Sequence, residues 1–271
     1  MNKLFKVEVI KTIGYPTFWA ILLLHALFYV LVIALGANLN LNIQGVEVFR
    51  LFSYDHIWGT MAWIASWFNL LLAILIIVLT GNELMYKTYR RQLLDGLTRG
   101  QLIFGKLMLI ACLSVYVVLL VTISGFMLGS AVGTWQDSYS VGFQYVFVLG
   151  LQSIAYMTFA MLTVFVFRNV GLSVVIYLLY FILVEPFIRL FFTSNVDKFF
   201  PVKIISNLTP MLDFMAMLAA NFSGQGMDTN SAYQIQSVPN GISMDISVPV
   251  CVVYIVMFVV VSGLLVKYRD F

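Results

Sequence analysis

The chain has 271 residues, of which 62% are hydrophobic and 10% are charged, and its formal net charge is +3. A soluble domain carries roughly 25% charged residues, so this composition excludes a soluble globular protein and predicts a chain embedded in a lipid bilayer. The sequence has no polybasic patch and no long run of like charges, so we expect no nucleic-acid partner.

Residues 1–15 predict an amphipathic helix that lies in the membrane interface. Apolar side chains are interspersed there with Lys3, Lys6 and Lys11. Pro16 separates this helix from the first long apolar run. That run is too long for the hydrophobic region of a signal peptide, so we expect a retained membrane span.

Six apolar runs are long enough to cross a hydrocarbon core, which needs about 20 residues of helix. The predicted spans are 17–36, 58–80, 107–130, 143–167, 172–192 and 248–267. The predicted fold class is therefore an all-α integral membrane protein with six transmembrane helices, formed as one domain of residues 1–271. The longest outer segment is 193–247, with an apolar first half suited to short helices and a polar second half.

The distribution of lysine and arginine sets the expected orientation. The residues on one side are Lys3, Lys6, Lys11, Lys87, Arg90, Arg91, Arg99, Lys106, Arg168, Lys267 and Arg269. The other side holds Arg50, Arg189, Lys198 and Lys203. By the positive-inside rule, both termini are cytoplasmic, and we expect a multi-pass protein of the cell inner (cytoplasmic) membrane.

The stretch GLTRGQLIFGKLM at 96–108 resembles a phosphate-binding loop, G-x-x-x-x-G-K-[ST]. However, Leu107 stands at the hydroxyl position, and no strand precedes the stretch. Thr98 and Gln101 instead form a capping box, which predicts a helix start near Arg99. Lys106 then lies inside a helix, so we expect this chain to bind no nucleotide.

Residues 82–98 predict a short amphipathic helix on the cytoplasmic side. Glu83 and Lys87 have the favourable i,i+4 order, and Gly96 suits the end of the helix. Periodicity alone fits two interpretations equally: a surface that docks on a partner, and an ordinary loop whose arginines only set the topology.

Glu83 followed by MYKTYRRQLLDGLTRGQLIFGKL resembles the coupling-helix region of type-2 ABC transporter permeases (ABC-2). In that family an acidic residue precedes a G-[LT]-[ST]-R turn and a lysine that begins the third span. The order of interfacial helix, six spans and large outer segment is also similar. The resemblance implies these docking residues: Glu83, Tyr86, Arg90, Gly96, Leu97, Thr98 and Arg99.

The resemblance also implies the function and the partners. The chain is expected to be the permease subunit of an ATP-driven exporter, paired with a second permease in a homo- or heterodimer. ATP and Mg are bound by a separate ATP-binding subunit, and this chain itself is not an enzyme. The translocation path lies between the two permeases, and the few charged side chains in the spans favour an amphiphilic or apolar substrate.

Several residues within the spans are candidates for the translocation path or its gating. They are Glu185, Pro186, Arg189, Trp63, Trp67 and Asn69. Pro186 predicts a kink or break in the fifth span. Glu185 and Arg189 form either a functional pair or, as we favour, a salt bridge near the outer interface. Trp63 and Trp67 face either substrate or lipid, and Asn69 is expected to form a hydrogen bond between helices.

The remaining patterns concern packing and metals. Gly125, Gly129 and Gly133 have the small-xxx-small spacing that lets helices approach closely, within the chain or in a dimer. His25 and His56 have no metal-ligand spacing, and we expect no metal site. Cys112 and Cys251 lie at different depths, which argues against a disulfide.

Two other functions compete with the exporter. A structural or assembly subunit of a larger membrane complex fits the same composition. An intramembrane enzyme, such as a lipid-modifying transferase, needs a nucleophile-base pair or a metal cluster. The sequence shows neither H-E-x-x-H nor G-x-S-x-G, so the enzyme is the weaker alternative.

Overall fold

The computed structural model describes residues 2–37, 40–43, 46–50, 57–132, 139–193, 196–209 and 243–268. Within these ranges, six helices are long and apolar enough to cross a membrane. The chain is therefore a multi-pass membrane protein, as its composition predicts. The six are α2 (Pro16–Ala37), α3 (Ile57–Met85), α5 (Arg99–Val132), α6 (Tyr139–Phe167), the composite helix beginning with α7 (Val170–Leu179), and α12 (Met244–Tyr268).

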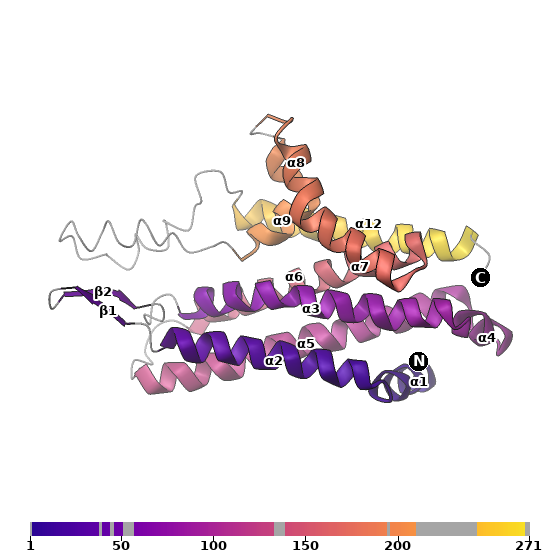
Figure 1. The fold of residues 1–271 in the computed structure, drawn as a ribbon, viewed down its shortest axis with the longest axis horizontal. Helices are drawn as coiled ribbons and strands as arrows, with labels where there is room; N and C mark the ends of the chain where they lie inside the picture. Colours follow the sequence, from indigo (N-terminus) through magenta and orange to yellow (C-terminus); the bar gives the residue numbers. More distant parts are fainter. Residues whose placement is uncertain are drawn as a thin grey trace.

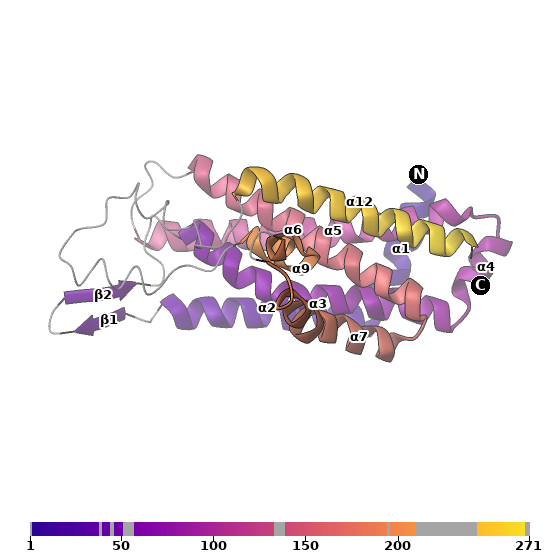
Figure 2. The same ribbon diagram turned by 90° about the horizontal axis from the view of Figure 1, so that it is seen from above.

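The long helices α2, α3, α5, α6 and α12 run side by side (Figures 1 and 2). Helix α6 is central, because it packs against α3, α5, α7 and α12. Two short helices, α1 (Asn2–Ile13) and α4 (Thr88–Leu94), lie together with the end of α12 at one end of the bundle, which we call the α4 end. In Figure 2, α1 crosses the axis of the bundle instead of following it.

The opposite end carries a feature that the sequence analysis did not predict. Strands β1 (Asn40–Ile43) and β2 (Val46–Arg50) form an antiparallel hairpin between the first two long helices (Figure 1). We call this the hairpin end. The predicted all-α fold class is correct for the bundle of long helices, to which the hairpin is a small addition.

The helix boundaries around α4 differ from the predicted helix at 82–98. Helix α3 continues through Glu83 to Met85, and Lys87 then adopts a left-handed conformation with φ 56°. A separate helix, α4, begins at Thr88 and ends at Leu94. Glu83 thus belongs to the second span, which is longer than the predicted 58–80 because its last turn is held by buried contacts described below.

The capping box predicted for the third span is present. The backbone N–H of Thr98 donates to Gln101 Oε1 at 2.9 Å, and the N–H of Gln101 donates to Thr98 Oγ1 at 3.3 Å. Helix α5 accordingly begins at Arg99. The preceding Gly96 has a φ of 93°, a conformation that side chains with a Cβ rarely adopt.

The fifth long helix is interrupted close to Pro186, as the proline predicts. After α7, a π-helical segment, η2 (Tyr180–Val184), leads into α8 (Glu185–Arg189). Proline lacks an N–H and its ring crowds the carbonyl of the preceding turn, so a regular α-helix cannot continue through it. Helix α8 leans away from the other long helices in Figure 1. It is followed by η3 (Asp197–Phe199) and α9 (Pro201–Asn207).

Gly125 marks a close contact within the chain. A Cβ at this position lies 2.6 Å from a ring carbon of Trp58, and that ring packs edge-on against Phe126 with centroids 5.7 Å apart. Gly129 lies further along α5, whereas Gly133 lies outside the described residues. The small residue at 125 therefore makes room for an indole of the neighbouring α3.

Replacing Gly125 with alanine is expected to lower the free energy of unfolding by about 1–3 kcal/mol, because the added methyl group overpacks the Trp58 contact. Thermal unfolding of the purified protein in detergent measures the change. Gly100 in the same helix is the matched control, since a Cβ there meets no atom within 4 Å. Equal losses for G125A and G100A would show that Gly125 is not a packing position.

Candidate functional site: a buried ionic cluster beside α4

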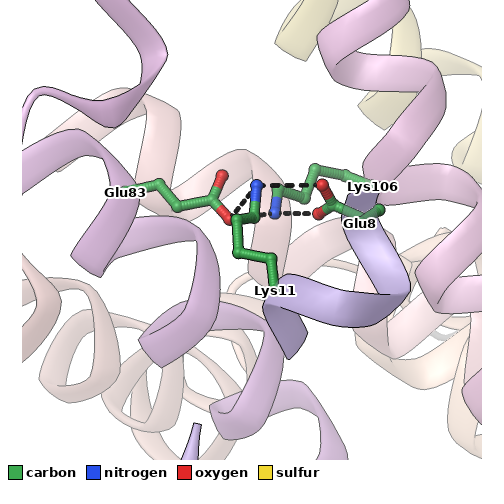
Figure 3. Close-up of polar contacts among 4 residues, drawn as sticks. All are labelled: Glu8, Lys11, Glu83 and Lys106. Atoms are coloured by element: carbon green, nitrogen blue, oxygen red, sulfur yellow. Dashed lines mark hydrogen bonds and ion pairs between the residues drawn. The ribbon is translucent and has the colours of Figure 1, made fainter. Parts of the chain in front are cut away.

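Four charged side chains meet at the α4 end (Figure 3). They are Glu8 and Lys11 of α1, Glu83 of α3 and Lys106 of α5, and we call them the ionic cluster. Lys106 Nζ lies 2.7 Å from Glu83 Oε1 and is also bonded to Glu8. Lys11 Nζ lies 2.9 Å from Glu8 Oε2 and 2.7 Å from Glu83 Oε1.

The cluster is buried and contains two positive and two negative charges. Lys106 is only 2% exposed, and Glu83 is 3% exposed. Charges removed from water are costly unless they are paired and hydrogen-bonded. Pairing each carboxylate with an ammonium group offsets the cost of burying these charges where α1, α3 and α5 meet.

The pKa values at the α1 side of the cluster favour the charged forms. Burial raises the pKa of Glu8, but the ammonium groups of Lys106 and Lys11 outweigh this effect, so its pKa lies below the ordinary value. Burial lowers the pKa of Lys11, but the carboxylates of Glu83 and Glu8 outweigh it, so its pKa lies above the ordinary value. Both side chains are ionised at neutral pH.

The sequence analysis paired Glu83 with the wrong lysine and gave Lys106 no partner. Glu83 was expected to pair with Lys87, but Lys87 is exposed beyond the end of α3. Lys106, which was expected only to lie inside a helix, is buried and pairs with Glu83. The available signal was Glu8, the single acidic residue in an otherwise basic N-terminal segment.

A cavity of about 120 Å³ adjoins the cluster and extends beneath α4. Its lining includes Glu8, Glu83, Lys106, Tyr89 of α4 and Gln101 of α5. This volume is large enough for several water molecules at polar groups. Burial raises the pKa of Tyr89 well above its ordinary value, and the nearby carboxylates add to this, so the phenol stays neutral.

The structure divides six of the seven predicted docking residues into two groups, and the seventh, Arg99, is described below. Glu83 belongs to the ionic cluster, Gly96 forms a turn, Thr98 caps α5, and Leu97 packs against the hydrophobic core. By contrast, Tyr86 is 74% exposed in the turn after α3, and Arg90 is exposed on α4.

Arg99 makes a long-range contact that the sequence did not reveal. Its Nη1 donates to the carbonyl of Val266 at 2.8 Å and to that of Lys267 at 2.6 Å. These carbonyls lie in the last turn of α12, where a helix has unsatisfied acceptors and a partial negative charge. Arg99 thus ties the start of α5 to the end of α12.

The exposed tip of the α4 end also includes apolar side chains that the sequence analysis did not select. Met85 is 55% exposed and Leu94 is 80% exposed. Together with Tyr86 and Arg90, they form a surface that we call the α4 tip. Exposed clusters of large apolar side chains are typical of interaction surfaces.

The predicted ion pair between Glu185 and Arg189 is absent from the described structure. Glu185 is 1% exposed and accepts the backbone N–H groups of Val202 at 2.9 Å and Lys203 at 2.7 Å. Arg189 Nη2 pairs instead with Asp197 at 3.2 Å. The amide groups in the first turn of α9 have no acceptor within their own helix, and the Glu185 carboxylate supplies one. This stabilisation outweighs the predicted i,i+4 ion pair with Arg189.

The other predicted positions in the spans lie in different environments. Trp63 and Trp67 pack edge-to-face with centroids 6.1 Å apart, and Trp67 is 63% exposed. Asn69 is buried, but its amide forms no hydrogen bond with any described residue, contrary to the predicted bond between helices. His25 Nδ1 lies 3.3 Å from the hydroxyl of Tyr116. Cys112 and Cys251 are both free.

No model of a known protein family matches the chain, and no curated protein matches its sequence.

Proposed function

We propose that this chain is the permease subunit of an ATP-driven exporter of the ABC-2 kind, working as a pair of permeases with a separate ATP-binding subunit. In this proposal both termini lie in the cytoplasm, α1 lies in the membrane interface, and the α4 tip docks on the ATP-binding subunit. The observation that carries the proposal is that the exposed tip begins at Met85, two residues after Glu83, and Glu83 belongs to the ionic cluster that joins α1, α3 and α5.

The chemistry of the α4 tip supports a protein partner. Met85, Tyr86 and Leu94 offer apolar contacts, and Arg90 and Arg91 add exposed positive charge beside them. Aromatic and arginine side chains are frequent among the residues that dominate protein interfaces. A groove with an apolar floor and acidic rim on the ATP-binding subunit is complementary to this surface.

The contacts beneath the tip provide a route for transmitting movement. Tyr89 is 1% exposed and packs edge-on against Phe165 of α6, with centroids 6.0 Å apart. Glu8, Glu83 and Lys106 of the ionic cluster line the same cavity as Tyr89, and Arg99 connects the start of α5 to α12. Displacement of α4 by the closing ATP-binding subunit is therefore passed to several spans together, which opens a path between the two permeases.

The test replaces only exposed residues, so that docking is separated from folding. The variant Y86S/L94S is expected to reduce co-purification of a co-expressed ABC ATP-binding subunit by roughly tenfold or more, and to abolish stimulation of its ATPase activity. Thermal unfolding of the variant is expected to match that of the unmodified chain.

The matched control is V196S/F199S, which replaces apolar residues that are 49% and 45% exposed away from the α4 end. This control is expected to retain the ATP-binding subunit. Retained association and stimulation in Y86S/L94S would refute docking at the α4 tip. If the unmodified chain associates with no ATP-binding subunit, the assembly-subunit alternative replaces the exporter.

A further inference from the structure

A second cavity, of about 320 Å³, lies between α3, α6, η2 and α9, away from the α4 end. Its lining includes Trp63 and Trp67 of α3, Tyr156 of α6, Phe181 of η2, and Lys203 and Ser206 of α9. The volume is in the range of small-molecule sites, which combine apolar walls with a few polar groups. The ionic cluster and the α4 tip do not use this cavity.

Helix α9 forms the polar wall and is fixed at both of its ends. At its start, the buried carboxylate of Glu185 accepts the N–H groups of Val202 and Lys203. At its end, Gln152 Nε2 donates to the carbonyl of Ile205 at 2.9 Å, and Thr209 Oγ1 donates to Gln152 Oε1 at 3.0 Å. Gln152 lies near the middle of α6, and α9 packs against both α6 and α12. The wall is therefore preformed.

The opposite wall is aromatic. The indole rings of Trp63 and Trp67 pack edge-to-face, and Tyr156 packs against Phe181 in the same manner at 5.4 Å. Because Trp67 is 63% exposed, the cavity is accessible at this side chain from outside the chain. Indole rings combine a large apolar surface with one polar N–H and suit the boundary between an acyl chain and a headgroup.

Lys203 gives the cavity its charge. The neighbouring carboxylates are already engaged: Glu185 by backbone amides and Asp197 by Arg189. In the part of the chain that the structure describes, the ammonium of Lys203 forms no ion pair. Burial lowers the pKa of Lys203, and the Arg189 guanidinium lowers it further. The Asp197 carboxylate opposes this only in part, so a bound anion would offset the remaining effect.

We propose that this cavity binds an anionic amphiphile, with its phosphate or carboxylate on the Lys203 ammonium and its apolar chain against Trp63 and Trp67. A cationic headgroup is disfavoured by Lys203 and Arg189, and a fully apolar ligand leaves the ammonium without a partner. The inference that this ligand is the exporter's substrate rests on the proposed function. The inference that the purified chain binds the ligand is independent of the proposed function.

The test uses phosphatidylglycerol, phosphatidylcholine with the same acyl chains, and inorganic phosphate as probes. Native mass spectrometry of the purified chain in neutral detergent is expected to show about tenfold tighter binding of phosphatidylglycerol than of phosphatidylcholine. The variant K203Q is expected to lose this preference, whereas K203R retains it. The variant W67S is expected to weaken both lipids while keeping their ratio.

Lys198 of η3 is the matched control, because it lies in the same connecting segment and does not line the cavity. K198Q is expected to behave like the unmodified chain. A preference that survives in K203Q, or that K198Q removes equally, overturns the proposal. If inorganic phosphate displaces phosphatidylglycerol at an equal concentration, the acyl chains contribute nothing to binding. The cavity is then a site for simple anions, and the proposal of an amphiphile is refuted. No ATP-binding subunit is needed, so a failure of docking at the α4 tip leaves this result unaffected.

Discussion

Replacing Lys106 with methionine is expected to lower the free energy of unfolding by about 3–5 kcal/mol, the cost of breaking a buried ion pair by removing one partner. Methionine fills much of the space of the lysine side chain but carries no charge. Within the cluster, Glu8 and Glu83 then share a single cation, Lys11. Denaturant or thermal unfolding of the purified protein in detergent measures the loss.

A second substitution distinguishes lost charge balance from lost packing. The variant E83Q/K106M leaves Glu8 and Lys11 as a balanced pair, and it is expected to recover roughly half of the lost stability or more. The exposed Lys87 supplies the control, since K87M is expected to change the stability by less than about 0.5 kcal/mol. A double variant as unstable as K106M would show that charge balance does not stabilise the cluster.

Replacing Glu185 with alanine is expected to lower the free energy of unfolding by about 2–4 kcal/mol, because two backbone N–H groups at the start of α9 lose their acceptor. The glutamine variant keeps one acceptor oxygen, and its loss is expected to be smaller. The same unfolding measurement in detergent applies to both variants.

The comparison that decides the role of Glu185 is R189A. Arg189 pairs with Asp197, and both side chains are about one quarter exposed, at 23% and 24%. An ion pair this accessible to water contributes about 0–1 kcal/mol, so R189A is expected to be mild. Equal losses of stability in R189A and E185A would show that Glu185 acts through Arg189 and not through the amides of α9.

The sequence predicted best those features that depend on neighbouring residues. The six apolar runs, the Thr98–Gln101 capping box, the turn at Gly96 and the interruption at Pro186 all arise from local backbone chemistry. Each of them is present in the structure. Their boundaries moved where tertiary contacts extended a helix, as at the end of α3.

The contacts that the sequence did not predict join residues far apart in the chain. Lys106 and Glu8 are separated by 98 positions, and Arg99 and Val266 by 167. The i,i+4 spacing predicted ion pairs of Glu83 with Lys87 and of Glu185 with Arg189. In the structure, Glu83 pairs with Lys106 of α5, and Glu185 accepts backbone N–H groups of α9. Burial also decided which predicted docking residues are available, since Tyr86 is exposed and Glu83 is not.

The ionic cluster also has a consequence for the order in which the chain is built. Glu8 and Lys11 emerge from the ribosome long before Glu83 and Lys106, because synthesis proceeds from the N-terminus. Until the third span arrives, the charges of α1 keep their hydration, and burying them is unfavourable. Docking of α1 is therefore a late event in biogenesis, and it can take place only after α3 and α5 have both been inserted.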